Sequence, residues 1–155
     1  MPNHLPRKCF GILLATLTFL FVLRVIGQVL VAYFDVRFLP AMEHWYSGLL
    51  PYPILLPVQI MMIALMVKII MDVRHGTGWF STANRKTGTV LKGVSYLYFL
   101  SMLVRYWLTM TRHPELRWFS HTIPIWFHMV LAAFVYVYGH YHTTYSSVSR
   151  KGSVP

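Results

Sequence analysis

Four long apolar runs separated by polar segments dominate the pattern of this chain. They cover residues of about 10–34, 54–72, 90–111 and 123–141. A helix needs roughly 20 mostly apolar residues to cross about 30 Å of hydrocarbon, and each run is close to that length or exceeds it. Helices of a soluble bundle carry a polar face, whereas these runs are apolar nearly all round. The pattern therefore predicts an all-α integral membrane protein, a bundle of four transmembrane helices.

The four runs form one predicted transmembrane domain, residues 1–142. Residues 143–155 are mostly small and polar, and we expect them to form a disordered cytoplasmic tail. The first run is too long for a signal peptide, so we expect it to remain as a span. Pro51 and Pro53 stand before the second run, and Pro57 lies near its start. Because proline lacks an amide donor and restricts the residue before it, a regular helix is not expected before about residue 56.

The composition agrees with lipid as the solvent of this chain. Hydrophobic residues make up 56% of it and charged residues 12%, whereas soluble domains carry about 25% charged residues. Cys9 is the only cysteine. The sequence therefore allows no disulfide within the chain and contains no cysteine-pair motif for zinc or redox chemistry.

The net charge of +10 is explained by where the basic residues fall. Nine of them lie before the first run, around the segment between the second and third runs, and after the fourth, against three in the opposite loops. The nine are Arg7, Lys8, Lys68, Arg74, Arg85, Lys86, Lys92, Arg150 and Lys151. The positive-inside rule then predicts that both termini are cytoplasmic. The charge thus points to a lipid bilayer as partner, and without a nucleic-acid-binding motif we expect no nucleic acid partner.

Five polar side chains of the apolar runs share one layer in the half toward the outer side, whereas the inner halves contribute almost none. They are Arg24, Gln28, Gln59, Arg105 and His128. At a rise of 1.5 Å per residue, Arg24 lies about 15 Å and Gln28 about 9 Å below the outer end of the first run, and Arg105 lies about 10 Å below that of the third. A charged side chain in a membrane helix is costly, and it persists where it faces the bundle interior.

The spacing of the polar residues predicts which faces turn inward. In the third run a polar stripe recurs every three or four residues, at Tyr98, Ser101, Arg105, Thr109 and Arg112. On the fourth run Ala132 and Gly139 share the side of His128, and small residues favour close helix packing. The simplest arrangement turns these faces around a polar pocket that opens outward. No acid lies in the interior of a run beside Arg24 and Arg105, so either the loop acids (Asp35, Glu43 and Glu115) cover them or an anion binds there.

The leading hypothesis is a small membrane protein that binds an amphipathic or anionic ligand in this pocket, such as a lipid or a quinone-like molecule. Arg24 and Arg105 would neutralise the charge of the ligand. Three further residues would orient it, and a loop would cover it. The orienting residues are Gln28, Gln59 and His128, and the covering loop contains Glu43, His44 and Tyr46.

Three alternatives remain open at this stage. The polar side chains could serve only as hydrogen-bonding glue between the helices. The chain could be an auxiliary or assembly subunit of a larger membrane complex, with membrane-protein partners or further copies of itself. It could also be a lipid-modifying enzyme with Glu43, His44 and His113 as its only acid–base candidates. Because no catalytic motif is present, the sequence favours a role other than catalysis.

The eight histidines do not predict a metal or haem site. A haem held by two histidines within the bilayer needs ligands on facing helices, and only His128 lies deep in a run. Candidate metal ligands on the outer side are scattered in sequence; they are Glu43, His44, His113 and His121. His140 and His142 form an H-x-H pair whose side chains diverge on a helix, and we interpret them as interfacial. The sequence identifies no cofactor.

Overall fold

The computed structural model describes residues 6–34, 36, 52–112 and 123–151. In this part of the chain the secondary structure is helical, with no strand. Its elements are α1 (Arg7–Phe34), α3 (Tyr52–His75), the short 3₁₀ helix η1 (Trp79–Ser81), α4 (Arg85–Arg112) and α5 (Ile123–Lys151). Each of the four α-helices is long and apolar enough to cross a membrane. The prediction of an all-helical fold with four span-length helices is therefore confirmed.

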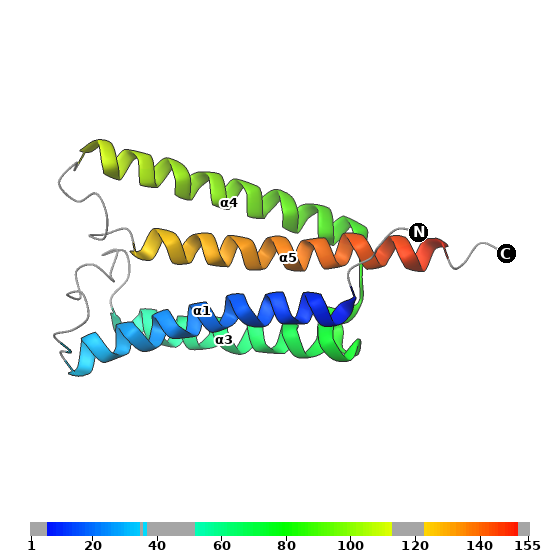
Figure 1. Cartoon of the computed structure of the whole chain (residues 1–155), viewed down its shortest axis with the longest axis horizontal. Coiled ribbons are helices and arrows are strands. Elements are labelled where there is room, and N and C mark those ends of the chain that lie inside the picture. The colour runs from blue at the N-terminus through cyan, green and yellow to red at the C-terminus, as the bar shows by residue number, and fades with distance from the viewer. Residues whose placement is uncertain (1–5, 35, 37–51, 113–122, 152–155) are drawn as a thin grey trace.

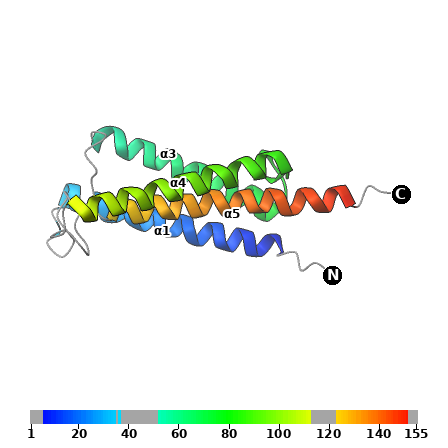
Figure 2. The same cartoon turned by 90° about the horizontal axis from the view of Figure 1, so that it is seen from above.

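The helices lie along one common axis (Figures 1 and 2). The backbone of α5 approaches α4 on one side and α1 on the other, while α3 packs on α1. Among the described elements, α4 comes close to α5 alone. The helices thus form a row, in the order α4, α5, α1, α3. The start of α1, the end of α3, the start of α4 and the end of α5 all lie at the same end of the bundle, along the helix axes (Figure 1). We call this end the basic end.

The best-packed part of the core is in the half toward the basic end. Phe10 and Leu14 of α1, Val73 of α3 and Tyr141 of α5 are almost completely buried there. These residues belong to one apolar cluster that three helices share. In contrast, large apolar side chains of α4 are exposed along its length, among them Leu97 and Trp107. Such an exposed apolar surface is what a helix in contact with lipid presents.

The pair α4 and α5 is held together by small residues. Gly88 of α4 and Gly139 of α5 lie so close that a Cβ atom on either would meet the backbone of the other helix. Two turns further along, the Ser95 hydroxyl donates to the carbonyl oxygen of Ala132 at 2.8 Å. The packing role expected of Ala132 and Gly139 is therefore confirmed, and their partners on α4 are Ser95 and Gly88.

Three helix ends differ from the sequence-based expectations. The expectation of no regular helix before about residue 56 is wrong, because α3 begins at Tyr52 and contains Pro57. Pro53 lies in the first turn, where the missing amide hydrogen has no intrahelical partner to lose. Helix α4 begins at Arg85, where the Asn84 side chain caps it by accepting from the Lys86 amide at 2.9 Å. Helix α5 continues to Lys151, through most of the segment expected to be a disordered tail.

Candidate functional site

Two buried amides form the centre of the predicted polar layer. Gln28 of α1 is 0% exposed and Gln59 of α3 is 3% exposed. The Gln59 Nε2 group donates to Gln28 Oε1 at 3.0 Å. This bond leaves Gln28 Nε2 and Gln59 Oε1 buried, and neither has a hydrogen-bond partner among the residues that the structure describes. If both side-chain amides were turned by 180°, so that oxygen and nitrogen exchange places, one donor group and one acceptor group would still be left without a bond.

A third open polar atom lies further toward the end opposite the basic end. The Tyr52 hydroxyl, two turns before Gln59 on α3, is buried and has no hydrogen-bond partner in the described part of the chain. Its ring contacts Tyr33 of α1, with the ring centroids 6.0 Å apart. The interface between α1 and α3 therefore carries hydrogen-bonding groups at two levels in this half of the molecule.

Arg24 lies one turn before Gln28 on the same face of α1. Its side chain is buried, and its guanidinium carbon is 5.5 Å from the ring centroid of Phe127 on α5. A cation over an aromatic face is attracted by the ring quadrupole, by about 2 kcal/mol where water is excluded. The structure thus places the charge of Arg24 between α1 and α5, facing the interior as the sequence predicted.

His128 joins the layer from α5. The Tyr98 hydroxyl of α4 and His128 Nδ1 form a hydrogen bond of 2.6 Å. This bond links α5 to α4 within the polar layer.

Arg105 is half-buried on α4 and borders a hollow of about 390 Å³. Described residues that line the hollow include Ser101, Thr109 and Arg112. The hydroxyls of Ser101 and Thr109 donate to backbone carbonyls of their own helix, so they offer lone pairs rather than hydrogens to the hollow. The donors there are the two guanidinium groups, whose planar fork suits a carboxylate or a phosphate.

The polar stripe of α4 is turned inward only in part. Tyr98, Arg105 and Thr109 are half-buried, whereas Ser101 and Arg112 are exposed. The expectation that the whole stripe faces the interior is therefore wrong. The reason is the packing of α4, which turns Gly88 and Ser95 toward α5 and leaves the stripe beside that contact.

Several predicted site residues lie outside the described part of the chain. These are Glu43, His44 and Tyr46, expected to cover the pocket, and His113 and His121, named with Glu43 and His44 as metal candidates. Among the described residues, no group of three His, Cys, Asp or Glu side chains could hold a metal ion.

A second polar cluster, at the basic end, was not predicted as a structural unit. His142 is 3% exposed, and its Nδ1 accepts the Asn84 amide hydrogen at 3.1 Å. The hydroxyls of Tyr138 and Tyr141 donate to the carbonyls of Phe80 and Ser81, at 3.0 and 2.8 Å. The interpretation of His142 as an interfacial residue did not foresee that its side chain is buried within the protein. Its Nδ1 binds the segment between α3 and α4, a pairing that the H-x-H pattern did not signal.

Comparison with known proteins adds no assignment to this geometry. No protein-family model, no curated protein and no solved structure matches the chain. The site must therefore be interpreted from its own chemistry. That chemistry consists of hydrogen-bonding and charged groups: two amides, two arginines, a histidine and a tyrosine, arranged across four apolar helices.

Proposed function

We propose that this chain is a multi-pass membrane protein with cytoplasmic termini that binds an amphipathic or anionic ligand in the half opposite the basic end. Arg24 and Arg105 neutralise negative charge on the ligand. Gln28, Gln59 and His128 orient its polar head. The apolar helix surfaces around this layer accommodate the hydrocarbon part.

The open amide groups of Gln28 and Gln59 are the observation that carries this proposal. A buried donor or acceptor without a partner costs about 1–3 kcal/mol. One donor and one acceptor remain open between the same two side chains, so a single head group with adjacent oxygens can satisfy both. A hydroxyl or a protonated carboxyl group has this capacity. A network that served only to hold helices together would gain stability by closing the second hydrogen bond itself.

The charge of Arg105 supports the same conclusion. The only acidic residue of the described part is Asp72, which lies at the basic end and is bound to Lys68 at 2.7 Å. None of the described residues is therefore available to Arg105 as a counter-charge. An arginine within a membrane helix is costly unless it meets an anion or water. A carboxylate or phosphate on the ligand meets this need.

Native mass spectrometry of the protein, extracted gently from its own membrane, tests the proposal. We expect a discrete bound small molecule in the wild type, lost in Arg105→Ala and in the double variant Gln28→Leu/Gln59→Leu. Lys92→Ala is the matched control, because it removes a half-buried basic side chain from the other half of α4. The proposal fails if the wild type carries no small molecule, or if both site variants retain it while remaining folded.

A second candidate function is that of a subunit in a larger membrane complex. The observation that favours it is the isolation of α4, which of the described helices approaches α5 alone and exposes large apolar side chains along its length. Such a surface can contact a partner helix as well as lipid. A native gel in mild detergent separates the two functions, because a subunit migrates with a stoichiometric protein partner and a binding protein migrates alone or as a small oligomer.

A further inference from the structure

The segment between α3 and α4, residues 76–84, is fixed to the bundle by hydrogen bonds; we call it the α3–α4 turn. Two of these bonds come from Asp72 near the end of α3. Its carbonyl accepts the Gly76 amide hydrogen at 2.9 Å, and its carboxylate accepts that of Phe80 at 3.2 Å. The other three come from α5, where Tyr138, Tyr141 and His142 bind the turn. The turn is therefore held from two helices.

The backbone of the α3–α4 turn depends on glycine. Gly76 has a φ of 70° and Gly78 a φ of 94°, values that other residues adopt at a cost. At Gly78 a Cβ atom would also collide with the carboxylate of Asp72. These two positions bend the chain tightly enough for the Asp72 carboxylate to reach the Phe80 amide.

Trp79 is the residue that this fixed turn presents outward. Its side chain is 93% exposed, although the next residue, Phe80, is partly buried and packs on the core cluster. A tryptophan on a free loop could lie against the protein and bury its ring. Here the hydrogen bonds on both sides of η1 hold the backbone, so the indole ring projects away from the bundle.

The end of the bundle that carries Trp79 is strongly basic. Seven basic residues with described side chains belong to it: Arg7, Lys8, Lys68, Arg74, Arg85, Lys86 and Lys92. Asp72 is the only acid in the described part of the chain, and Lys68 and the Phe80 amide already bind its carboxylate. No described carboxylate at this end is thus left to repel an anion.

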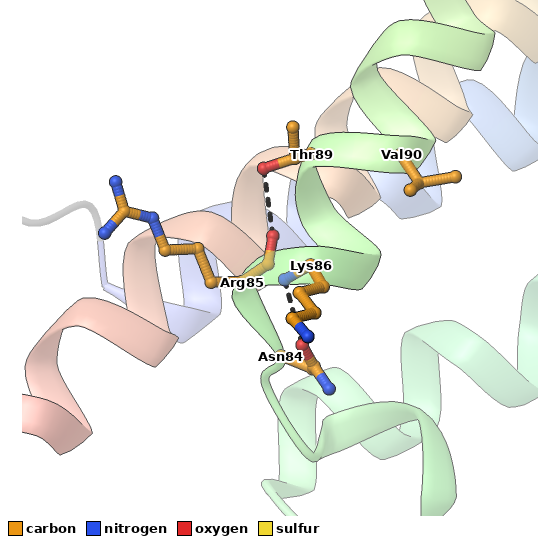
Figure 3. A pocket seen from close by; sticks show the side chains of 5 residues that line it. All are labelled: Asn84, Arg85, Lys86, Thr89 and Val90. Carbon is orange, nitrogen blue, oxygen red and sulfur yellow. Dashed lines mark hydrogen bonds between the residues drawn. The ribbon is translucent and has the colours of Figure 1, made fainter.

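Arg85 and Lys86 open α4 immediately after the turn. They border a hollow of about 800 Å³, together with Asn84, Thr89 and Val90. In Figure 3 the Arg85 side chain reaches away from the helix, on the other side from Lys86 and Asn84. Both basic side chains are exposed. Their charges are therefore available to a partner that also meets Trp79.

We propose that the α3–α4 turn is a preformed docking element for an anionic lipid surface, in which Trp79 enters the headgroup layer and Arg85 and Lys86 bind lipid phosphates. The proposal rests on the membrane placement stated above but not on the ligand site in the opposite half. Charge complementarity selects the partner, because the surface combines exposed cations with one exposed indole. Tryptophan is favoured at the level of lipid headgroups, where its ring meets apolar and polar surroundings together.

The rigidity of the turn adds to this argument. A surface that is already ordered loses little conformational freedom on binding, so more of its contact energy appears as affinity. Basic side chains near an anionic leaflet contribute independently of the turn, in proportion to their number. The turn adds depth and orientation, since it fixes the indole relative to Arg85 and Lys86.

The test uses the full chain reconstituted in phosphatidylcholine vesicles with and without phosphatidylglycerol. Alkaline carbonate extraction first establishes that the protein is inserted. The contribution of Trp79 to fluorescence is then the difference between wild type and Trp79→Phe, with Trp126→Phe as the matched control for an exposed tryptophan. We expect bromine atoms placed near the lipid headgroups to quench the Trp79 difference signal more strongly than bromine atoms at the chain ends.

The second measurement is the preference of spin-labelled phosphatidylglycerol over phosphatidylcholine for the protein surface. We expect the variant Arg85→Gln/Lys86→Gln to reduce this preference at least about fivefold, as for the loss of one headgroup-bound charge. The control is Arg37→Gln/Arg117→Gln, which removes two charges from segments that the sequence assigns to the opposite side.

The outcomes separate this inference from the proposed function. Failure of carbonate-resistant insertion overturns the membrane placement, and both proposals fall with it. Insertion without headgroup quenching of Trp79 overturns the docking element alone. Equal losses of lipid preference in the two double variants also overturn it, because the effect would then be one of net charge. If a co-purifying acidic protein shields Trp79 from the brominated lipids, the partner of the turn is that protein and not a lipid surface, and the proposal is overturned.

Discussion

Replacing Gly88 with alanine tests the close backbone contact between α4 and α5. A Cβ atom at this position would lie 2.8 Å from the Gly139 carbonyl oxygen and 2.8 Å from the Thr143 amide nitrogen. These are backbone atoms of α5, which cannot rotate away. For the contact to relax to an ordinary 3.4 Å, the two helices must separate locally by about 0.6 Å. Separation also stretches the nearby bond from Ser95 to Ala132, which measures 2.8 Å.

The expected magnitude follows from two opposing terms. Forcing an extra carbon into a close-packed contact costs about 1–3 kcal/mol. Alanine is the better helix former by about 1 kcal/mol, which offsets part of that cost. Gly93→Ala is the matched control on the same helix, because a Cβ atom there meets nothing within 4 Å. The difference between the two variants cancels the propensity term, and we expect Gly88→Ala to be less stable by about 1–3 kcal/mol.

Unfolding in mixed micelles of a mild detergent and dodecyl sulfate, followed by far-ultraviolet circular dichroism, measures the free energy of unfolding of both variants. Gly93→Ala should be as stable as the wild type or slightly more stable. If Gly88→Ala matches Gly93→Ala, α4 does not pack on α5 through this contact. The position of α4 beside α5 in the row of helices would then be wrong.

Three further predictions concern the polar groups. Gln59→Leu should destabilise the fold by about 1–3 kcal/mol, because it leaves the Gln28 amide buried alone. The double variant Gln28→Leu/Gln59→Leu should recover most of that loss in the same unfolding assay, and equal losses in the two variants would contradict the pairing. Tyr141→Phe removes the bond to the Ser81 carbonyl and should cost about 1 kcal/mol, with faster hydrogen exchange in the α3–α4 turn; unchanged exchange would contradict the anchoring role. Asp72→Asn should lower the melting temperature and increase proteolysis within the turn, and a protease-resistant turn in this variant would show that the carboxylate does not hold it.

Much of the fold could be predicted because its signals are local. Whether a segment is long and apolar enough to span a membrane depends on its own residues, so all four helices were located from the sequence. Errors fell at the ends, where context decides. Pro53 is tolerated at the start of α3 because the first turn needs no amide donor. The end of α5 remains helical although its composition resembles a linker.

The candidate site could be predicted only as a layer. Depth along a helix is fixed by the rise per residue, so the sequence indicated that polar groups share one level. It did not indicate which would pair. Gln28 and Gln59 are 31 residues apart, and Tyr98 and His128 are 30 apart. Such pairings depend on the rotation and spacing of helices, which are set by side-chain packing.

By itself, the sequence determined the helical class, the four helices of span length, the basic end and the level of the buried polar residues, since each follows from composition and spacing along one segment. The tertiary structure alone decided three features of the described residues. Of the described helices, α4 approaches only α5; the Gln28 and Gln59 amides leave one donor and one acceptor open among these residues; and His142 binds the turn before α4. The physical reason is that the two kinds of feature depend on interactions of different range along the chain. Hydropathy acts on each segment separately, whereas close approach at Gly88 and Gly139 requires two surfaces to fit together.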